Sequence, residues 1–300
     1  MKKIVGFIGL LLIVVLIWFS FIKPYDHQID FEVNLPAGSA YYMILDTTNF
    51  ENKTLKIKER NLFKSVRMET SFSQKPFELL WEFENINDTN AKVHLYYKNQ
   101  NNSLKERYLS LFNQSQNLDS LIGLSKKIKT KANNFSKFFK VEINGIETLE
   151  ETAYLYVQHK SKREEKAGDM ISSNSLLFKK NRDSLVTTNG QTFVKVDNWK
   201  PDTDSISFRY AFPVKSQTHY PTDKFVKADT LKKRQALKAT FYGNYSLSDQ
   251  AWIALYHYAK RKNIDITLSP VEIYYNNPML GGDDKKWKTE VFMPIKQQNN

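Results

Sequence analysis

The chain of 300 residues contains no cysteine. This absence excludes disulfide bonds, thiolate metal sites, cysteine nucleophiles and a lipoprotein anchor attached through cysteine. Histidine is scarce, with five residues, and no two of them form a His-x-x-x-His pair, so the sequence predicts no metal site. A Gly-x-Ser-x-Gly motif and a phosphate-binding loop are also missing, and we expect no cofactor.

The positive charge of the chain has no nucleic-acid motif to go with it. The formal net charge is +12, yet the sequence holds no helix-turn-helix, zinc-finger spacing or RNP-like stretch. Lysines and arginines alternate with acids along the chain, as in SKREEKAGD at residues 161–169. We therefore interpret the charge as a basic, solvated surface that favours anionic lipid headgroups, and we expect no nucleic-acid partner.

One long hydrophobic run is present, from Ile4 to Ile22, and it holds no charged residue. As a helix it would extend about 28 Å, close to the thickness of the hydrocarbon core of a membrane. A cleavable signal peptide is the alternative, but the bulky Trp18, Phe19 and Phe21 stand where the small residues of a cleavage site belong. We expect a retained membrane anchor over residues 4–22, within an N-terminal segment 1–24.

The charges that flank this run predict its orientation. Lys2 and Lys3 precede it, and Asp26, Asp30 and Glu32 follow soon after it. By the positive-inside rule, we expect a single-pass cytoplasmic membrane protein with its N-terminus in the cytoplasm. The bulk of the chain would then lie on the outer, periplasmic or extracytoplasmic, side.

Residues 25–140 predict a first α+β domain. Apolar and polar residues alternate from residue 28 to 35, which indicates a half-buried strand, and a short helix follows at residues 40–45. Three or four more alternating runs lead to a long amphipathic helix at residues 119–139. This order resembles the START-like helix-grip fold, also called the SRPBCC or polyketide cyclase superfamily, in which a long helix closes a curved antiparallel sheet. The resemblance implies a cavity of the kind that holds lipids or other small molecules.

Residues 141–300 predict a second domain with an internal repeat. The runs RYAFPVK (209–215) and EVFMPIK (290–296) end in the same Pro-x-Lys pattern, and each closes a strand, helix, strand, strand series. The second helix is the clearer of the two, with a capping-box pattern at Ser246 and Asp249 and Asn263 at its C-terminal end. We expect two βαββ units that pair about a pseudo-dyad and leave a cleft between them.

The last 60 residues resemble the GyrI-like effector-binding domain, which is also found at the C-terminus of AraC-type and MerR-type regulators. The resemblance rests on FYGNYSLSDQAWIALYHYAKRKNI, SPVEIYYNNP and WKTEVFMPIK. It covers residues 141–296. The sequence departs from the family pattern at Asn244, Phe241 and Phe292, where proline, histidine and an aromatic hydroxyl are usual.

The resemblance implies a set of ligand-binding residues. Strand alternation alone leaves open whether Glu272 and Glu290 face inward or toward solvent. In the family, glutamates at these two strand positions line the cleft and meet cationic or amphipathic ligands. We therefore expect a pocket for an amphipathic or cationic small molecule or a lipid, lined by Glu272, Glu290, Tyr242, Tyr245 and Tyr274, with the aromatic rings attracting a cation.

Three functions remain open from the sequence. The first is a membrane-anchored, non-catalytic binding protein of the bacterial envelope. The second is a hydrolase of small electrophilic, cyclopropane-type compounds, with Glu272 or Glu290 as general acid or base and Tyr245 or Tyr274 assisting. The third is a structural envelope protein whose pockets are filled with its own side chains.

Overall fold

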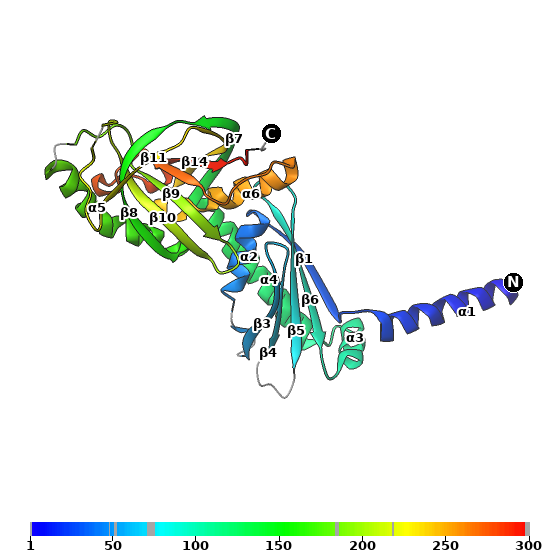
Figure 1. Ribbon diagram of the computed structural model, residues 1–300. Helices are drawn as coiled ribbons and strands as arrows, with labels where there is room; N and C mark the ends of the chain where they lie inside the picture. The colour runs from blue at the N-terminus through cyan, green and yellow to red at the C-terminus, as the bar shows by residue number, and fades with distance from the viewer. Residues whose placement is uncertain are drawn as a thin grey trace. The chain divides into compact units, whose positions relative to one another are not determined.

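The computed structural model describes residues 2–47, 49–50, 53–70, 76–183, 186–217 and 219–297 (Figure 1). The chain divides into two compact units, Met1–Asn134 and Phe135–Asn300. The division falls a few residues before the predicted domain boundary at 140/141. Each unit has its own antiparallel sheet, as predicted for an α+β chain.

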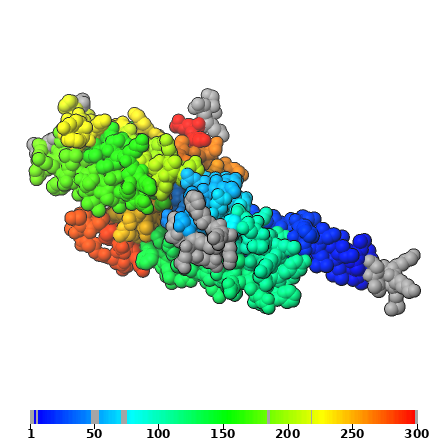
Figure 2. Space-filling model, turned by 90° about the horizontal axis from the view of Figure 1, so that it is seen from below, coloured from blue at the N-terminus to red at the C-terminus, as the bar shows by residue number. Residues whose placement is uncertain are grey.

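The first unit begins with an apolar helix. Helix α1 (Lys2–Ile17) continues without a gap into a turn of π-helix, η1 (Trp18–Ile22). Apart from the half-buried Phe19, the large apolar side chains described along both are exposed, and Figure 2 shows α1 extending away from the body of its unit. Within the described ranges, no helix has both the length and the apolar character needed to cross a membrane.

A six-stranded antiparallel sheet follows, with the strand order β1-β6-β5-β4-β3-β2. The alternation predicted for β1 is confirmed, because Gln28, Asp30 and Glu32 are exposed while Val33 is buried. The strands are β1 (His27–Val33), β2 (Asn49–Phe50), β3 (Lys53–Asn61), β4 (Ser65–Thr70), β5 (Phe77–Asn85) and β6 (Ala91–Asn99).

Three α-helices complete the first unit. Helix α2 (Ala37–Leu45) packs on strands β4 to β6. Helix α4 (Gln116–Phe135) buries one stripe at helical spacing, Leu121, Ser125, Ile128 and Ala132. Helix α3 (Ser103–Leu111) was not predicted from the sequence.

The second unit contains an eight-stranded sheet with the order β11-β8-β10-β9-β13-β14-β12-β7. Helices α5 (Lys166–Asp183) and α6 (Gln250–Lys262) pack on it. The strands are β7 (Phe139–Leu149), β8 (Thr152–Lys162), β9 (Phe193–Lys200), β10 (Ser205–Pro213), β11 (Lys227–Leu231), β12 (Arg234–Gly243), β13 (Val271–Tyr274) and β14 (Lys288–Pro294). Short 3-10 turns are η2 (Ser136–Phe138), η3 (Arg163–Glu165), η4 (Tyr245–Leu247), η5 (Pro278–Leu280) and η6 (Asp284–Lys286).

The predicted duplication is confirmed by the topology. The units β8-α5-β9-β10 and β12-α6-β13-β14 meet where β9 pairs with β13, so one continuous sheet joins them. The edge strands β7 and β11 were not predicted, and each crosses over: β7 precedes the first repeat but pairs with β12, and β11 precedes the second repeat but pairs with β8. The amphipathic helix predicted over residues 119–139 extends too far, because α4 ends at Phe135 and β7 begins at Phe139.

The termini of α6 confirm one prediction and correct another. Asn263 adopts a left-handed conformation with φ of 54°, as expected for a helix C-cap. The capping box at Ser246 and Asp249 is wrong: Asn244 accepts the hydrogen bond from the Ser246 amide, and the Asp249 carboxylate pairs with Arg163 instead. Asp249 therefore fixes α6 to the turn that precedes α5.

Candidate ligand-binding site

The two faces of the eight-stranded sheet have different surroundings. On β13, Glu272 and Tyr274 point toward α5, where they contact Lys166 and Met170. Because side chains alternate along a strand, Val271 and Ile273 point to the other face. We call the first the helix face and the second the open face.

The strand register places the two predicted glutamates on opposite faces. Ile273 is directly opposite Glu290 across the β13–β14 pair, and opposed residues share a face. Glu290 therefore lies on the open face, whereas Glu272 lies on the helix face. The five predicted ligand-binding residues divide in the same way, with Tyr242 joining Glu290 and with Tyr245 and Tyr274 lying near Glu272.

Glu272 forms a buried ion pair with Lys166 of α5. The Nζ atom lies 2.7 and 2.6 Å from the two carboxylate oxygens, and the two side chains are 1% and 0% exposed. The ammonium group also donates to the Ser248 hydroxyl at 2.9 Å and lies 4.7 Å above the Trp252 ring. Lys166 thus supplies, from within the chain, the cation that the resemblance assigned to a ligand.

Tyr274 completes this buried group. Its hydroxyl donates to Glu272, and its side chain is buried. Burial, together with the charge of Glu272, raises the pKa of Tyr274 well above its ordinary value. The phenol is therefore held as a neutral hydrogen-bond donor.

Tyr245 closes one end of the β13–β14 hairpin. The Asn276 amide donates to its hydroxyl at 2.7 Å, and the hydroxyl donates to the Asn276 carbonyl at 3.0 Å. Its ring contacts Tyr274 and Trp287 with centroid distances of 4.7 and 5.3 Å. Burial raises the pKa of Tyr245 to about 12. The hydroxyl is thus engaged by the backbone of the hairpin.

Lys166 was not predicted as a site residue from the sequence, although its position on α5 could have indicated it. It occupies the first position of the stripe that α5 buries, followed by Met170, Ser173 and Leu177. A lysine at a buried position of an amphipathic helix requires a counter-charge, because an unpaired charge is costly to bury. Its partner is 106 residues away in the sequence, so only the fold identifies it.

The open face carries an apolar cluster at its centre. The cluster is formed by side chains from both repeats and from the edge strands, namely Leu149, Tyr154, Tyr156, Phe193, Ala211, Leu231, Ala236, Val271 and Phe292, with the half-buried Ile273 packed against them.

Two cavities lie on this face. One, of about 120 Å³, is lined by Lys195, Asp197 and Arg234 as well as by apolar groups. The other, of about 210 Å³, is lined mainly by apolar groups that include Phe193, Ile273 and Phe292. Leu149 and Leu231 line both cavities. Together the two cavities combine an apolar floor with a charged end.

Glu290 lies beside the apolar cluster in a network of basic groups. Its carboxylate is 2.8 Å from Lys288 Nζ and 3.3 Å from Lys238 Nζ, and it accepts a hydrogen bond of 2.8 Å from the Tyr275 hydroxyl. Lys238 Nζ also lies 5.5 Å from the centroid of the Phe292 ring. Burial acts to raise the pKa of Glu290, but the hydrogen bonds and the lysine charges outweigh it and hold the pKa below its usual range.

Arg209 occupies the corresponding place in the first repeat. Its guanidinium lies 3.0 Å from Asp197, contacts Asp229, and stands 4.7 Å from the centroid of the Tyr156 ring. The two repeats thus place opposite charges, Arg209 and Glu290, at matching strand positions. Both charges are balanced by residues of the open face.

Tyr242 lies on β12 opposite Lys288 and is half-buried. By alternation it shares the open face with Lys238, at the end of the sheet near Glu290.

In the part of the chain that the structure describes, no group of three or more His, Asp or Glu side chains is placed to hold a metal ion.

Comparison with known families agrees with this architecture. The model of the GyrI-like small molecule binding domain matches residues 145–296, just over half of the chain. The chain belongs to the GyrI-like family. Its second unit is therefore a GyrI-like small-molecule binding domain. The search among curated proteins finds no significant match.

Solved structures that match this GyrI-like chain share little sequence with it. The C-terminal domain of EcmrR is 14% identical to this chain, with a TM-score of 0.44. The match covers 53% of this chain and 99% of the EcmrR domain. SAV2435 bound to tetraphenylphosphonium is 14% identical, with coverage of 52% and 94% and a TM-score of 0.35. A hydrolase encoded by lin2189 from Listeria innocua is 12% identical, with coverage of 52% and 92% and a TM-score of 0.34.

Proposed function

We propose that this protein is a membrane-anchored, non-catalytic binding protein whose ligand is an amphipathic small molecule held on the open face of the GyrI-like unit. The observation that carries the proposal is the pair of cavities over the apolar cluster, both of which are lined by Leu149 and Leu231. Binding sites for small molecules are mostly apolar with a few polar groups that fix orientation. An apolar body would rest on Phe193 and Phe292, with a polar end near Lys195 and Asp197.

The charge of the ligand is limited by the groups already present. Glu290 has two lysine partners, so a cationic ligand would have to displace Lys238 or Lys288 from it. Asp197 is similarly paired with Lys195 and Arg209. We therefore propose that apolar contact provides most of the affinity, and that Glu290 and Tyr242, which line neither cavity, act on the charge of the ligand only through the field of the open face.

Glu272, Tyr245 and Tyr274 have a different proposed role, which is to maintain the shape of the sheet beneath the site. A Glu/Tyr hydrolase would use a pair such as Glu272 and Tyr274, which are in contact. Both side chains are buried, however, and neither lines the two cavities on the open face. A non-catalytic role accounts better for a carboxylate that is already neutralised by Lys166.

We also propose that residues 4–22 anchor the protein in a membrane and that the first unit is a START-like domain. The exposed apolar side chains of α1 and η1, which are contiguous from Lys2 to Ile22, support the anchor. A strand, a helix, an antiparallel sheet and a closing helix support the START-like fold. A reporter enzyme that is active only in the cytoplasm, fused after Asn300, should be inactive in cells; activity would contradict the proposed orientation.

The binding site can be tested by filling its cavities. Leu231→Trp places a larger side chain at a buried residue that lines both cavities, and Leu280→Trp makes the same change at a leucine that is 84% exposed in the same unit. We expect Leu231→Trp to abolish binding of a fluorescent amphiphile such as anilinonaphthalene sulfonate, and Leu280→Trp to leave it unchanged. Circular dichroism of both variants checks that the unit remains folded. Equal binding by folded Leu231→Trp and wild type would overturn the proposed site.

A further inference from the structure

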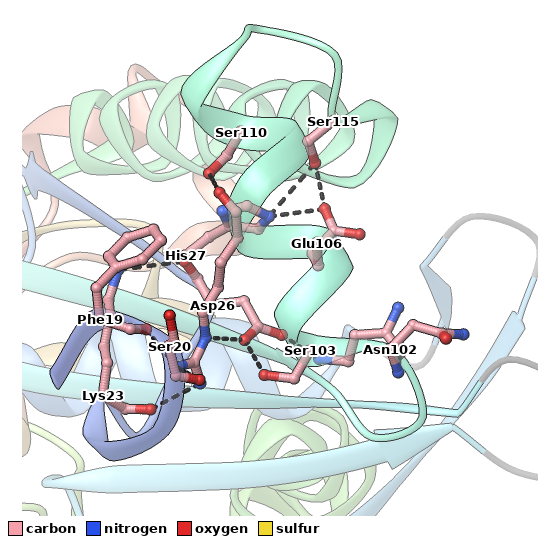
Figure 3. A network of polar contacts seen from close by, with 12 residues as sticks. Phe19, Ser20, Lys23, Asp26, His27, Asn102, Ser103, Glu106, Ser110 and Ser115 are labelled. Carbon is pink, nitrogen blue, oxygen red and sulfur yellow. Dashed lines mark hydrogen bonds and ion pairs between the residues drawn. The ribbon is translucent and has the colours of Figure 1, made fainter. Parts of the chain in front are cut away.

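Helix α3 of the first unit is fixed to its surroundings by buried charges on one side. Glu106 accepts a hydrogen bond from Ser115 and pairs with His27 at 2.8 Å (Figure 3). It also accepts a hydrogen bond of 2.7 Å from Asn117. Arg107 pairs with Asp26 at 2.8 Å, and the side chains of these two residues are 4% and 0% exposed. The orientation of α3 on the unit is therefore fixed.

The same arginine attaches α3 to the end of the apolar N-terminal helix. Its guanidinium donates to the carbonyl groups of Phe19 at 2.7 Å, Ser20 at 3.3 Å and Lys23 at 2.7 Å. A cation is favourable there, because the last carbonyl groups of a helix lack partners within it. Tyr108 adds a second contact, with its hydroxyl 3.0 Å from the Ser20 hydroxyl and its ring 6.0 Å from that of Phe19.

Another side of α3 is apolar and, apart from the contact of Tyr108 with η1, exposed. Leu104, Tyr108 and Leu111 recur at a spacing that places them on one face of α3, and Phe112 follows as its C-cap residue. They are 43%, 38%, 59% and 70% exposed. Lys105 lies beside this face and is also exposed. Exposed apolar groups gathered on one helix indicate an interaction surface.

The position of this surface indicates its partner. Helix α3 lies next to η1 (Figure 1). Trp18, Phe21 and Ile22 of η1 are also exposed, so exposed apolar side chains are present on both the proposed anchor and α3. Aromatic residues and lysines at the end of a membrane anchor are typical of the headgroup region, where lysine side chains extend toward water. A lipid bilayer that holds residues 4–22 would reach the apolar face of α3.

We infer that α3 is an interfacial helix that inserts its apolar face, formed by Leu104, Tyr108, Leu111 and Phe112, into the headgroup region of the bilayer. The inference rests on the proposed membrane anchoring. Because Arg107 joins α3 to the end of the anchor, this second contact fixes the orientation of the first unit on the membrane. An anchor alone would leave that unit free to tilt.

The absence of cysteine permits a direct test on the full chain. Phe112→Cys and Ile86→Cys each provide one labelling site for an environment-sensitive fluorophore. The two labelling sites lie at opposite ends of the six-stranded sheet. Ile86 is 50% exposed and follows β5, at the end where Val33 pairs with Ala91. Helix α3 follows β6, at the end where His27 pairs with Tyr97. The two ends are separated by about 20 Å of strand. Both proteins are reconstituted in vesicles of phosphatidylcholine and phosphatidylglycerol.

We expect the label at residue 112 to shift to shorter emission wavelength and to lose intensity when nitroxide-labelled lipids are added, with neither change at residue 86. Flotation of the same vesicles reports the anchor separately. If the proteins float but the label at residue 112 is not quenched, the inference is overturned and the anchor stands. If the emission shift occurs without quenching and vanishes when the protein is diluted, the apolar face binds a second copy of the chain instead of lipid. Failure to float would overturn the anchor and the inference with it.

Discussion

The GyrI-like unit contains two glutamates in neighbouring strands with very different environments. Glu272 lies under the helices with Lys166 and Tyr274 and is fully buried. Glu290 lies on the open face with Lys238, Lys288 and Tyr275 and is half-buried. Both have basic partners, but water reaches only the second site. The comparison shows that residues in similar sequence contexts acquire different roles from the face on which the register places them.

The largest expected effect is the loss of stability in Glu272→Gln. The substitution leaves the Lys166 ammonium buried without its counter-charge, which costs about 3–5 kcal/mol in comparable buried pairs. Urea denaturation of the full chain, followed by tryptophan fluorescence, measures the change. A loss below about 1 kcal/mol, the scale of an exposed ion pair, would contradict the distinction between the two glutamates.

Replacing both members of the buried pair should recover part of this loss. In Lys166→Met with Glu272→Gln, no charge remains in the interior, and Tyr274 can still donate to the amide oxygen of the glutamine. We expect the double variant to be more stable than Glu272→Gln alone. The matched control is Lys238→Met with Glu272→Gln, which should show no recovery, since Lys238 lies on the other face.

Glu290→Gln should change stability little and ligand preference more. A partly exposed ion pair contributes about 0–1 kcal/mol, so the unfolding free energy should change by no more than that. On the open face, the substitution leaves Lys238 and Lys288 in excess. We expect tetraphenylphosphonium to bind more weakly and anilinonaphthalene sulfonate more tightly, by factors of up to about 5. Equal shifts for both probes would argue against a role of Glu290 in selecting charge.

The smallest expected effect is on the pH dependence of stability. The pKa of Glu290 is lowered from the ordinary value of 4.5, so the native state favours the ionised form. This contribution is fully present above pH 4.5 and is lost as the pH falls through the lowered pKa. Urea denaturation at several pH values gives the free energy of unfolding of wild type and of Glu290→Gln. The excess stability of wild type over the variant should therefore decrease as the pH falls below 4.5. If the excess stability of wild type instead increased on acidification, the ionised form of Glu290 would not be the one that stabilises the native state.

The sequence predicted the parts of the fold that local patterns encode. Alternation identified β1, and helical spacing together with Asn263 identified α6 and its end. Helix α3 was missed because its buried side consists of Glu106 and Arg107, which have the pattern of a solvated surface. Strands β7 and β11 were missed because each pairs with the repeat that is more distant along the chain.

The candidate site was predictable only as a group of residues. Family resemblance indicated Glu272 and Glu290, but their faces depend on the pairing of Ile273 with Glu290, which no single strand reveals. Lys166 could be identified as an unusual buried lysine, whereas its partner required the fold. The cavities likewise depend on Leu149 and Leu231, which terminate the two edge strands that the sequence did not predict.

The measurement that tests the account most directly is hydrogen–deuterium exchange of the full chain with and without anilinonaphthalene sulfonate. A ligand on the open face should slow exchange at the rims of the cavities, in residues 148–152, 189–193 and 231–234, and leave α5 and η4 unchanged. Protection centred on α5 and η4, around Lys166 and Ser248, with none at the rims would place the ligand at Glu272 and contradict the account.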